Sequence, residues 1–247
     1  MTLPKAILFD LDDTLISYSG ERREVWTETL TPHLHRCAGR SADAILKAMD
    51  MEMRWFWSDP VRHREGRLNM QAARMRICAG GFKRLGVEDA TLVADIATSF
   101  HVNREMRMRL FDDAHHVLDT LKADGYRLCL ITNGEGPVQR EKVNRFDLGH
   151  RFHHIQIEGE HPFGKPEPAA YAHALKTLGA LHAEAWIVGD NLEWEVAVPK
   201  TLGFARCIWF DAFARGLPKK ATVTPDHSLT RLRDILAMLA PPMPAPP

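Results

Sequence analysis

The sequence contains little cysteine, no excess of either charge and no long apolar segment. Its four cysteines are far apart in 247 residues and form no Cys-x-x-Cys pair, so a zinc site or a thiol redox centre is a weak expectation. Lysine plus arginine and aspartate plus glutamate number 32 each, and a net charge of zero favours neither a nucleic acid polymer nor an anionic membrane as partner. No apolar run reaches membrane-spanning length, and the N-terminal apolar stretch is too short for a signal peptide. These absences predict a cytoplasmic protein of ordinary globular composition.

The most informative segment follows the apolar run Ala6-Ile7-Leu8-Phe9, where Asp10 and Asp12 stand two positions apart. The run is short enough for a buried parallel strand, and open α/β sheets bind ligands at the carboxyl ends of such strands. Two carboxylates this close repel each other unless a cation or a shared proton offsets their charge. The pattern therefore indicates a metal beside a carboxylate that can act as a nucleophile. A strand that ends in an acidic turn is the plainer alternative.

The chain is long enough for one large or two modest domains, and the pattern of its predicted helices and strands changes near residue 111. The stretch from 18 to 109 has helical character, with apolar stripes at Val25, Leu30 and Leu34, at Ile45, Met49, Met53 and Trp57, and at Leu92, Ile96 and Phe100. After residue 111, helices and strands alternate, with strands expected at 128–131, 155–157, 185–188 and 206–210 and helices at 114–123, 137–146, 168–178 and 232–239. This alternation predicts an α/β fold, a Rossmann-like parallel sheet with helices on both faces. Residues 1–17 and 110–240 then form the core, 18–109 a helical insertion, and 241–247 a disordered proline-rich tail.

Four polar groups stand after buried runs or at helix starts, and in a parallel sheet they converge on one edge. They are Asp10-x-Asp12-x-Thr14, Thr132-Asn133, Lys165 within Gly-Lys-Pro, and Gly189-Asp190. Taken singly, Thr132 and Asp190 could be turn residues and Lys165 a solvated loop lysine. In this order and spacing the four groups resemble the haloacid-dehalogenase-like hydrolase superfamily. The resemblance covers the chain except its proline tail, and it implies that residues 18–109 are the helical cap of that family.

The resemblance implies a phosphatase chemistry in which Asp10 attacks phosphorus and becomes an aspartyl-phosphate. Asp12 is then the acid that protonates the leaving group and later takes a proton from water. Mg²⁺ is the implied cofactor, held by the side chain of Asp10, the backbone carbonyl of Asp12 and Asp190, because hard oxygen ligands suit this ion. Dehalogenases of the superfamily lack an acid at the position of Asp12, so its presence favours phosphate chemistry.

The resemblance also implies that Thr132, Asn133 and Lys165 hold the oxygens of the transferring phosphoryl group, with Lys165 counted among the catalytic residues. One feature departs from the family pattern. Many relatives have a second aspartate four or five residues after the Gly-Asp pair, whereas this chain has Glu193 and Glu195. Glu195, at the five-residue offset, is expected to give direct or water-mediated support to the metal.

The expected substrate is a small phosphorylated metabolite. The segment Trp55–Arg67 combines aromatic and arginine side chains that could bind a base or sugar and an acidic group, although a packed aromatic face with exposed arginines is the favoured interpretation. The leading hypothesis is an Mg²⁺-dependent phosphomonoester hydrolase. A phosphotransferase or phosphomutase on the same scaffold is the alternative, and a catalytically silent binding protein is a weaker one. The sequence leaves the oligomeric state open.

Overall fold

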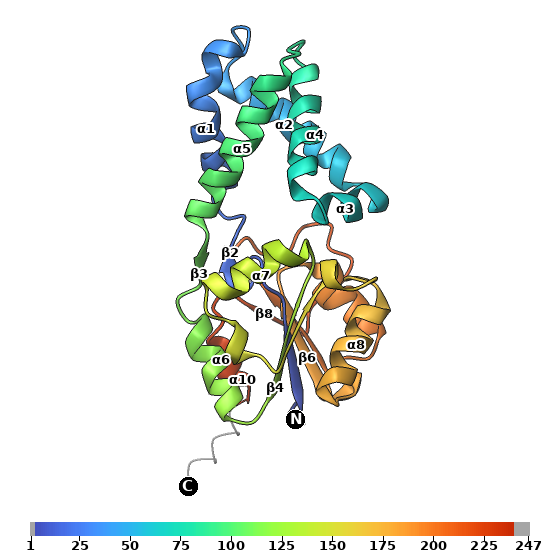
Figure 1. The fold of residues 1–247 in the computed structure, drawn as a ribbon. Helices are drawn as coiled ribbons and strands as arrows, with labels where there is room; N and C mark the ends of the chain where they lie inside the picture. Colours follow the sequence, from blue (N-terminus) through green and yellow to red (C-terminus); the bar gives the residue numbers. More distant parts are fainter. Residues whose placement is uncertain (1–2, 240–247) are drawn as a thin grey trace. The chain divides into compact units, whose positions relative to one another are not determined.

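The computed structural model describes residues 3–239, and the contacts between its residues divide the chain into two compact units (Figure 1). The core unit consists of Met1–Ser17 and Arg109–Pro247, and the helical unit is Tyr18–Met108. At the boundary, the short strands β2 (Ile16–Ser17) and β3 (Arg109–Leu110) pair antiparallel, so the two connecting segments leave the core unit side by side. Within residues 3–239, no helix is both long and apolar enough to span a membrane.

The core unit is built on a six-stranded sheet with the order β5-β4-β1-β6-β7-β8, in which all neighbouring pairs are parallel. The strands are β1 (Ala6–Phe9), β4 (Arg127–Thr132), β5 (His154–Ile157), β6 (Ala185–Gly189), β7 (Arg206–Phe210) and β8 (His227–Leu229). Both faces of β1 and β6 are buried, which explains their unbroken apolar sequences. In register, the last residue of β1, Phe9, pairs with Leu130 and Val188, so β4 and β6 end within two residues of the end of β1.

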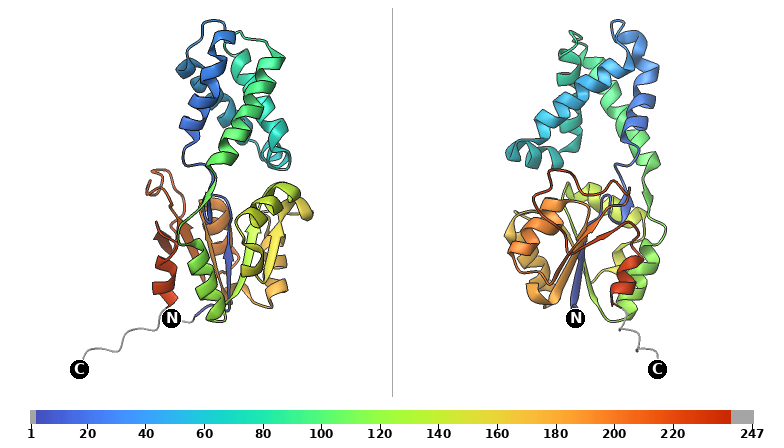
Figure 2. Two further views of the ribbon diagram at one scale, coloured as in Figure 1. Left: turned by 60° about the vertical axis from the view of Figure 1, so that its left-hand side comes forward. Right: turned by 180° about the vertical axis from the view of Figure 1, so that it is seen from behind.

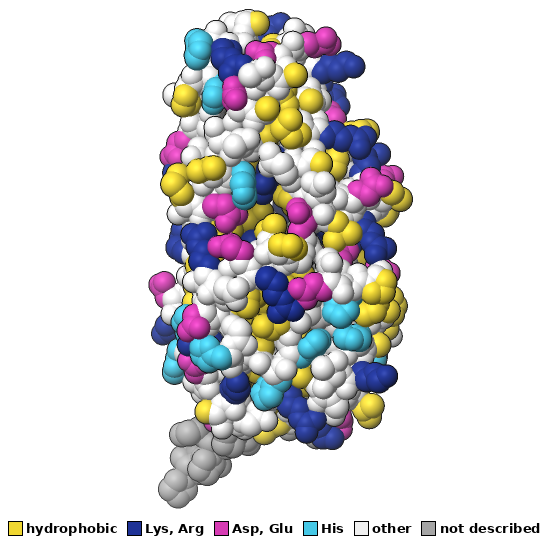
Figure 3. Space-filling view, viewed as in Figure 1, with side chains coloured by type: hydrophobic (Ala, Val, Ile, Leu, Met, Phe, Trp, Pro, Cys, Tyr) yellow, Lys and Arg dark blue, Asp and Glu magenta, His cyan; other side chains and the backbone are white. Residues whose placement is uncertain are grey.

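Helices cover both faces of this sheet (Figure 2). They are α6 (Ala114–Ala123), α7 (Gly136–Arg145), α8 (Pro168–Leu178), α9 (Val198–Thr201) and α10 (Asp234–Leu239), with a π-helix η5 (Leu192–Ala197) and the short 3-10 helices η2 (Gly149–Arg151), η3 (Glu158–Glu160) and η4 (His182–Glu184). On one face, Tyr171 and Leu175 of α8 pack against Leu8, Ile131 and Ile187 of the sheet. The opposite face is covered by α6 and α10 (Figure 2). The face of the core unit drawn in Figure 3 mixes acidic, basic and histidine side chains, as expected for a chain of zero net charge.

The helical unit contains α1 (Arg22–Leu30), the 3-10 helix η1 (Thr31–Arg36), α2 (Ala42–Trp57), α3 (Pro60–Arg67), α4 (Met70–Lys83) and α5 (Ala90–Arg107). Helices α2, α3, α4 and α5 begin at side chains that accept a backbone N–H at the N-cap, namely Ser41, Asp59, Asn69 and Asp89. The core of the unit includes Trp26 of α1, which stacks on Phe100 of α5 with ring centroids 3.8 Å apart.

The predicted fold class is confirmed, and each of the five predicted core strands is present. Two features differ from the predictions. The stripe through Val25, Leu30 and Leu34 predicted one helix, but α1 ends at Leu30 and Leu34 lies in η1, because Pro32 has no backbone N–H to continue an α-helical ladder. The sixth strand, β8, was not predicted, since three residues with only one buried side chain give almost no periodic signal. The predicted disorder of the proline tail concerns residues outside the described range.

Candidate active site

The predicted site residues follow three neighbouring strands of the core sheet. Asp10 comes directly after β1, Thr132 is the last residue of β4, and Asp190 comes directly after β6. Because these parallel strands lie side by side and end within two residues of one another, the three residues share one edge of the sheet. The backbone N–H of Asp10 donates to the carbonyl of Val188 (3.0 Å), which continues the ladder between β1 and β6 to this edge.

The Asp10 carboxylate is held at both oxygens. Lys165 Nζ donates to Oδ1 at 2.6 Å, and Thr14 Oγ1 donates to Oδ2 at 3.1 Å. Burial raises the pKa of the Asp10 carboxyl, and the ammonium group of Lys165 partly offsets that increase. An ionised carboxylate that is shielded from water, oriented and still rich in lone pairs is the form required of a nucleophile.

Lys165 is completely buried between two acids. Its Nζ lies 2.6 Å from Asp10 Oδ1 and 2.7 Å from Glu195 Oε1. Burial alone lowers the pKa of this ammonium, but the two carboxylates outweigh burial and raise the pKa above its usual value. The Asn133 side chain fixes the backbone of Lys165, accepting its N–H at Oδ1 (2.9 Å) and donating from Nδ2 to its carbonyl (2.6 Å). Lys165 is therefore positioned both through its side chain and through its backbone.

Glu195 lies on η5 with no exposed surface, and the structure places it against Lys165. Its second oxygen, Oε2, accepts the backbone N–H of Asn191 at 3.1 Å. Burial raises the pKa of Glu195 to about 7, although the charge of Lys165 opposes the increase. Gly189 is needed beside it, because a Cβ at that position would lie 2.3 Å from Glu195 Cγ and 3.0 Å from Asp10 Cβ. Glu193, two residues earlier in the sequence, is exposed.

Asp12 turns its side chain toward helix α7. Lys142 Nζ donates to both of its carboxylate oxygens at 2.8 Å, and Gln139 Nε2 donates to Oδ2 at 3.2 Å. The same Gln139 amide donates to Thr132 Oγ1 at 2.7 Å. Thr132 and Asp12 are thereby joined through one buried amide. Gln139 and Lys142 cannot be identified as site residues from the sequence, because their three-residue spacing on a polar helix carries no signal until α7 is placed over the edge of the sheet.

The residues present fit a hard divalent cation. Burial raises the pKa of the Asp190 carboxyl well above its usual range, and the nearby charges of Asp10 and Glu195 raise it further. Asp13, which is buried beside them with a left-handed φ of 59°, adds a fourth acid to this edge. The ammonium of Lys165 contacts two of these four carboxylates, and its single charge leaves an excess of negative charge that a cation would neutralise. Within residues 3–239, no three side chains of His, Cys, Asp or Glu form a metal-binding group, but the implied set needs only two side chains and a backbone carbonyl.

The aromatic segment of the helical unit is partly packed and partly exposed. Phe56 is buried in a small cluster with Ala73 and Ile77, as the favoured interpretation of this segment predicted. Trp55 is 43% exposed, and the guanidinium of Arg62 lies over its ring at 4.1 Å from the centroid. An exposed indole covered by a guanidinium contributes a cation–π contact of about 0.5–1 kcal/mol.

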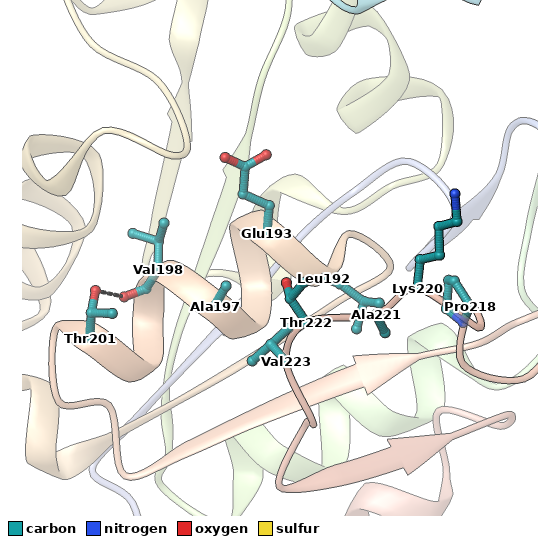
Figure 4. Close-up of a pocket in the computed structure, with 10 residues that line it drawn as sticks. All are labelled: Leu192, Glu193, Ala197, Val198, Thr201, Pro218, Lys220, Ala221, Thr222 and Val223. Carbon is teal, nitrogen blue, oxygen red and sulfur yellow. Dashed lines mark hydrogen bonds between the residues drawn. The ribbon is translucent and has the colours of Figure 1, made fainter.

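A separate pocket of about 620 Å³ lies in the core unit between the helices that follow β6 and the loop before β8 (Figure 4). Its lining is largely apolar or small, with two charged residues, and consists of Leu192, Glu193, Ala197, Val198, Thr201, Pro218, Lys220, Ala221, Thr222 and Val223. In Figure 4 the Glu193 carboxylate points away from the loop residues Thr222 and Val223. None of the predicted catalytic residues lines this pocket, so it is distinct from the carboxylate site at the sheet edge.

A parallel α/β sheet with a buried Asp–Lys pair at the end of its first strand, and a helical unit inserted after that strand, defines a class of hydrolase. The model of the haloacid dehalogenase-like hydrolase family matches residues 4–203. The chain belongs to this family.

Individual proteins extend this similarity over nearly the whole chain. The chain is 30% identical to a phosphoserine phosphatase from Thermus thermophilus over 94% of its own length and 97% of that protein. It is 25% identical to a glyceraldehyde 3-phosphate phosphatase from Methanopyrus kandleri over 94% and 95% of the two chains. A magnesium-bound HAD-hydrolase from Bacillus subtilis has the same fold, with a TM-score of 0.72 and 17% identity over 97% of this chain and all of that chain.

Proposed function

We propose that the chain is an Mg²⁺-dependent phosphomonoester hydrolase that acts through an aspartyl-phosphate on Asp10. The observation that carries the proposal is the Asp10 carboxylate, buried after β1 and held at one oxygen by Lys165 and at the other by Thr14. Asp12 stands two residues further on with its own separate partners. Two acids with different environments suit two different roles, a nucleophile and a proton carrier.

In the first half-reaction, an Asp10 oxygen forms a bond to phosphorus while the bond from phosphorus to the alcohol oxygen breaks. Asp12 gives its proton to the departing alkoxide, which leaves as the alcohol. In the second half-reaction, water attacks the aspartyl-phosphate and gives a proton to Asp12. The bond from phosphorus to Asp10 then breaks, and inorganic phosphate and the Asp10 carboxylate are released.

In phosphoryl transfer the protein must chiefly stabilise negative charge on the phosphoryl oxygens. Lys165 would do so with a buried ammonium whose position is fixed by Glu195 and by the Asn133 side chain. Gln139 donates to the Thr132 hydroxyl oxygen, and that hydroxyl in turn donates to the backbone carbonyl of Asn133 at 3.4 Å, a long contact that a bound phosphoryl oxygen would replace as acceptor. Asn133 then acts chiefly by holding Lys165.

Asp10, Asp190 and the backbone carbonyl of Asp12 are the groups that would hold Mg²⁺. The bound ion would supply positive charge that offsets the phosphate and the acids around it. The Asp12 side chain is kept off the metal in this assignment, because its oxygens face Lys142 and Gln139. Glu195 supports the site through Lys165 rather than as a metal ligand.

The relatives support a small phosphorylated metabolite as the substrate, since phosphoserine and glyceraldehyde 3-phosphate are named for two proteins that align along nearly the whole chain. A phosphotransferase or phosphomutase would use the same aspartyl-phosphate and differ only in its acceptor. A dehalogenase has no need of a proton donor, because halide leaves unprotonated, and the oriented Asp12 argues against that reaction.

The test is phosphate release from p-nitrophenyl phosphate and from a panel of phosphorylated metabolites, with Mg²⁺ and with chelator. Wild type, Asp10→Asn and the exposed control Asp124→Asn are compared. We expect release that requires Mg²⁺ and is lost only in Asp10→Asn, because an amide is a poor nucleophile. Retained turnover in Asp10→Asn would refute the aspartyl-phosphate mechanism, and isomerised product without free phosphate would assign a phosphomutase.

A further inference from the structure

Helix α7 presents a buried cation to the acid that we assign to proton transfer. Lys142 is 2% exposed, and its Nζ lies 2.8 Å from both oxygens of the Asp12 carboxylate. The two residues are 130 positions apart, so only the packing of α7 over the end of β1 brings them together. Burying an ammonium is costly unless it is paired with an acid, and a symmetric contact with both oxygens is a specific geometry rather than a chance surface pair.

The partners of Asp12 and Asp10 are kept separate. Lys165 contacts Asp10, whereas Lys142 and Gln139 contact Asp12. Each of the two acids therefore has a buried lysine of its own. Donors that hold both oxygens of a carboxyl group restrict its rotation, and a proton donor must stay within hydrogen-bond reach of the atom that it protonates.

We propose that Lys142 is a positioning residue for proton donation, which fixes the orientation of the Asp12 carboxyl group toward the departing leaving group. The inference deepens the proposed function and rests on it. Gln139 assists by holding Oδ2 of Asp12 and by tying it to Thr132, so that the proton donor and the phosphate-binding hydroxyl keep a fixed separation. The effect of Lys142 is then confined to substrates whose leaving group needs a proton.

Leaving-group dependence separates this role from a purely structural one. An alkoxide leaving group needs a proton from Asp12, whereas p-nitrophenolate leaves without one. The probes are therefore β-glycerophosphate and p-nitrophenyl phosphate. The quantity compared is kcat/KM, which reports steps only through the first irreversible one, the phosphorylation of Asp10.

We expect Lys142→Met to lower kcat/KM for β-glycerophosphate by about 10- to 100-fold, a part of the 10²–10⁴-fold contributed by general acid catalysis. For p-nitrophenyl phosphate the loss should stay below about threefold, because that reaction does not use the acid. Lys142→Arg, which keeps the charge, should restore part of the alkyl phosphate activity. Lys142→Gln is measured in parallel, so that the result does not depend on the folding of a single variant. Lys176→Met, the same change at an exposed lysine of α8, is the matched control.

A double-mutant cycle with Asp12→Asn gives an independent readout. If Lys142 acts through Asp12, then Lys142→Met should change alkyl phosphate turnover by less than about threefold in the Asp12→Asn background. Equal losses on both substrates, or a full additional loss on top of Asp12→Asn, would overturn the inference while leaving the proposed hydrolase intact. Turnover that does not require Asp10 would instead overturn the proposed function, and the inference with it.

Discussion

The most demanding prediction concerns folding stability after the buried ammonium of Lys165 is removed. Lys165→Met keeps the length of the side chain but leaves Asp10 and Glu195 without their shared cation. The lysine has no exposed surface, and its Nζ lies 2.6 and 2.7 Å from the two acids. Removing one partner of a buried ion pair typically costs about 3–5 kcal/mol, because the remaining charge is buried without compensation. For a protein of this size that loss lowers Tm by about 6–20 °C.

The loss of stability in Lys165→Met should depend on pH in a defined direction. Even with Lys165 present, burial raises the pKa of Glu195 to about 7. The ordinary value is 4.5, so the folded state binds the proton more tightly than the unfolded state. Stability associated with this group is therefore greatest at low pH and is lost as pH rises through the folded-state pKa. Without the lysine that pKa rises further, so Lys165→Met should be least stable at pH 8 and should recover toward wild type by pH 5.

The assay is thermal unfolding followed by circular dichroism between pH 5 and pH 8, with chelator present so that no metal binding contributes. The exposed Lys176→Met is the matched control, and its Tm should change by less than about 2 °C, since exposed substitutions alter stability by about 0.5 kcal/mol or less. Lys165→Met/Glu195→Gln removes one of the two orphaned acids and should recover part of the loss. A Tm within about 2 °C of wild type at pH 8, or a deficit that is the same at every pH, would refute the argument from buried charge.

Three other changes test separate parts of the structure. Glu195→Gln should lower kcat but leave the Mg²⁺ concentration for half-maximal activity nearly unchanged, because Glu195 contacts Lys165. A large increase in that concentration, measured by Mg²⁺ titration, would instead make Glu195 a metal ligand. Gly189→Ala should destabilise the core unit by about 1–3 kcal/mol in thermal unfolding, because the new Cβ would lie 2.3 Å from Glu195 Cγ, and a wild-type Tm would contradict that geometry. Burial, with neighbouring His173, lowers the pKa values of His154 and His161 below 6.5, so stability should fall as pH decreases through 6.5 toward 5. His154→Gln should flatten that pH dependence and the exposed His116→Gln should not; equal slopes in thermal unfolding would contradict the assignment.

The sequence by itself determined the architecture of the core and the candidate chemistry. Strands such as 185–188 are continuous apolar runs because both of their faces are buried, and such runs can be recognised without any tertiary information. Asp10, Asp12 and Asp190 could be selected for the same reason, since each follows one of these runs or lies close behind it. Lys165 was selected only through the family resemblance, because a single loop lysine carries no local signal.

The tertiary structure decided which groups act together. The contact of Glu195 with Lys165 depends on the turn that η5 makes over Gly189, and the sequence offset alone did not predict that contact. The pairing of Lys142 with Asp12 depends on where α7 lies relative to β1, which is fixed by packing between segments more than a hundred residues apart. Spacing along the chain determines strands and helices because their hydrogen bonds and side-chain periodicities are regular. The partner of a buried charge is instead determined by the three-dimensional packing that excludes water from it.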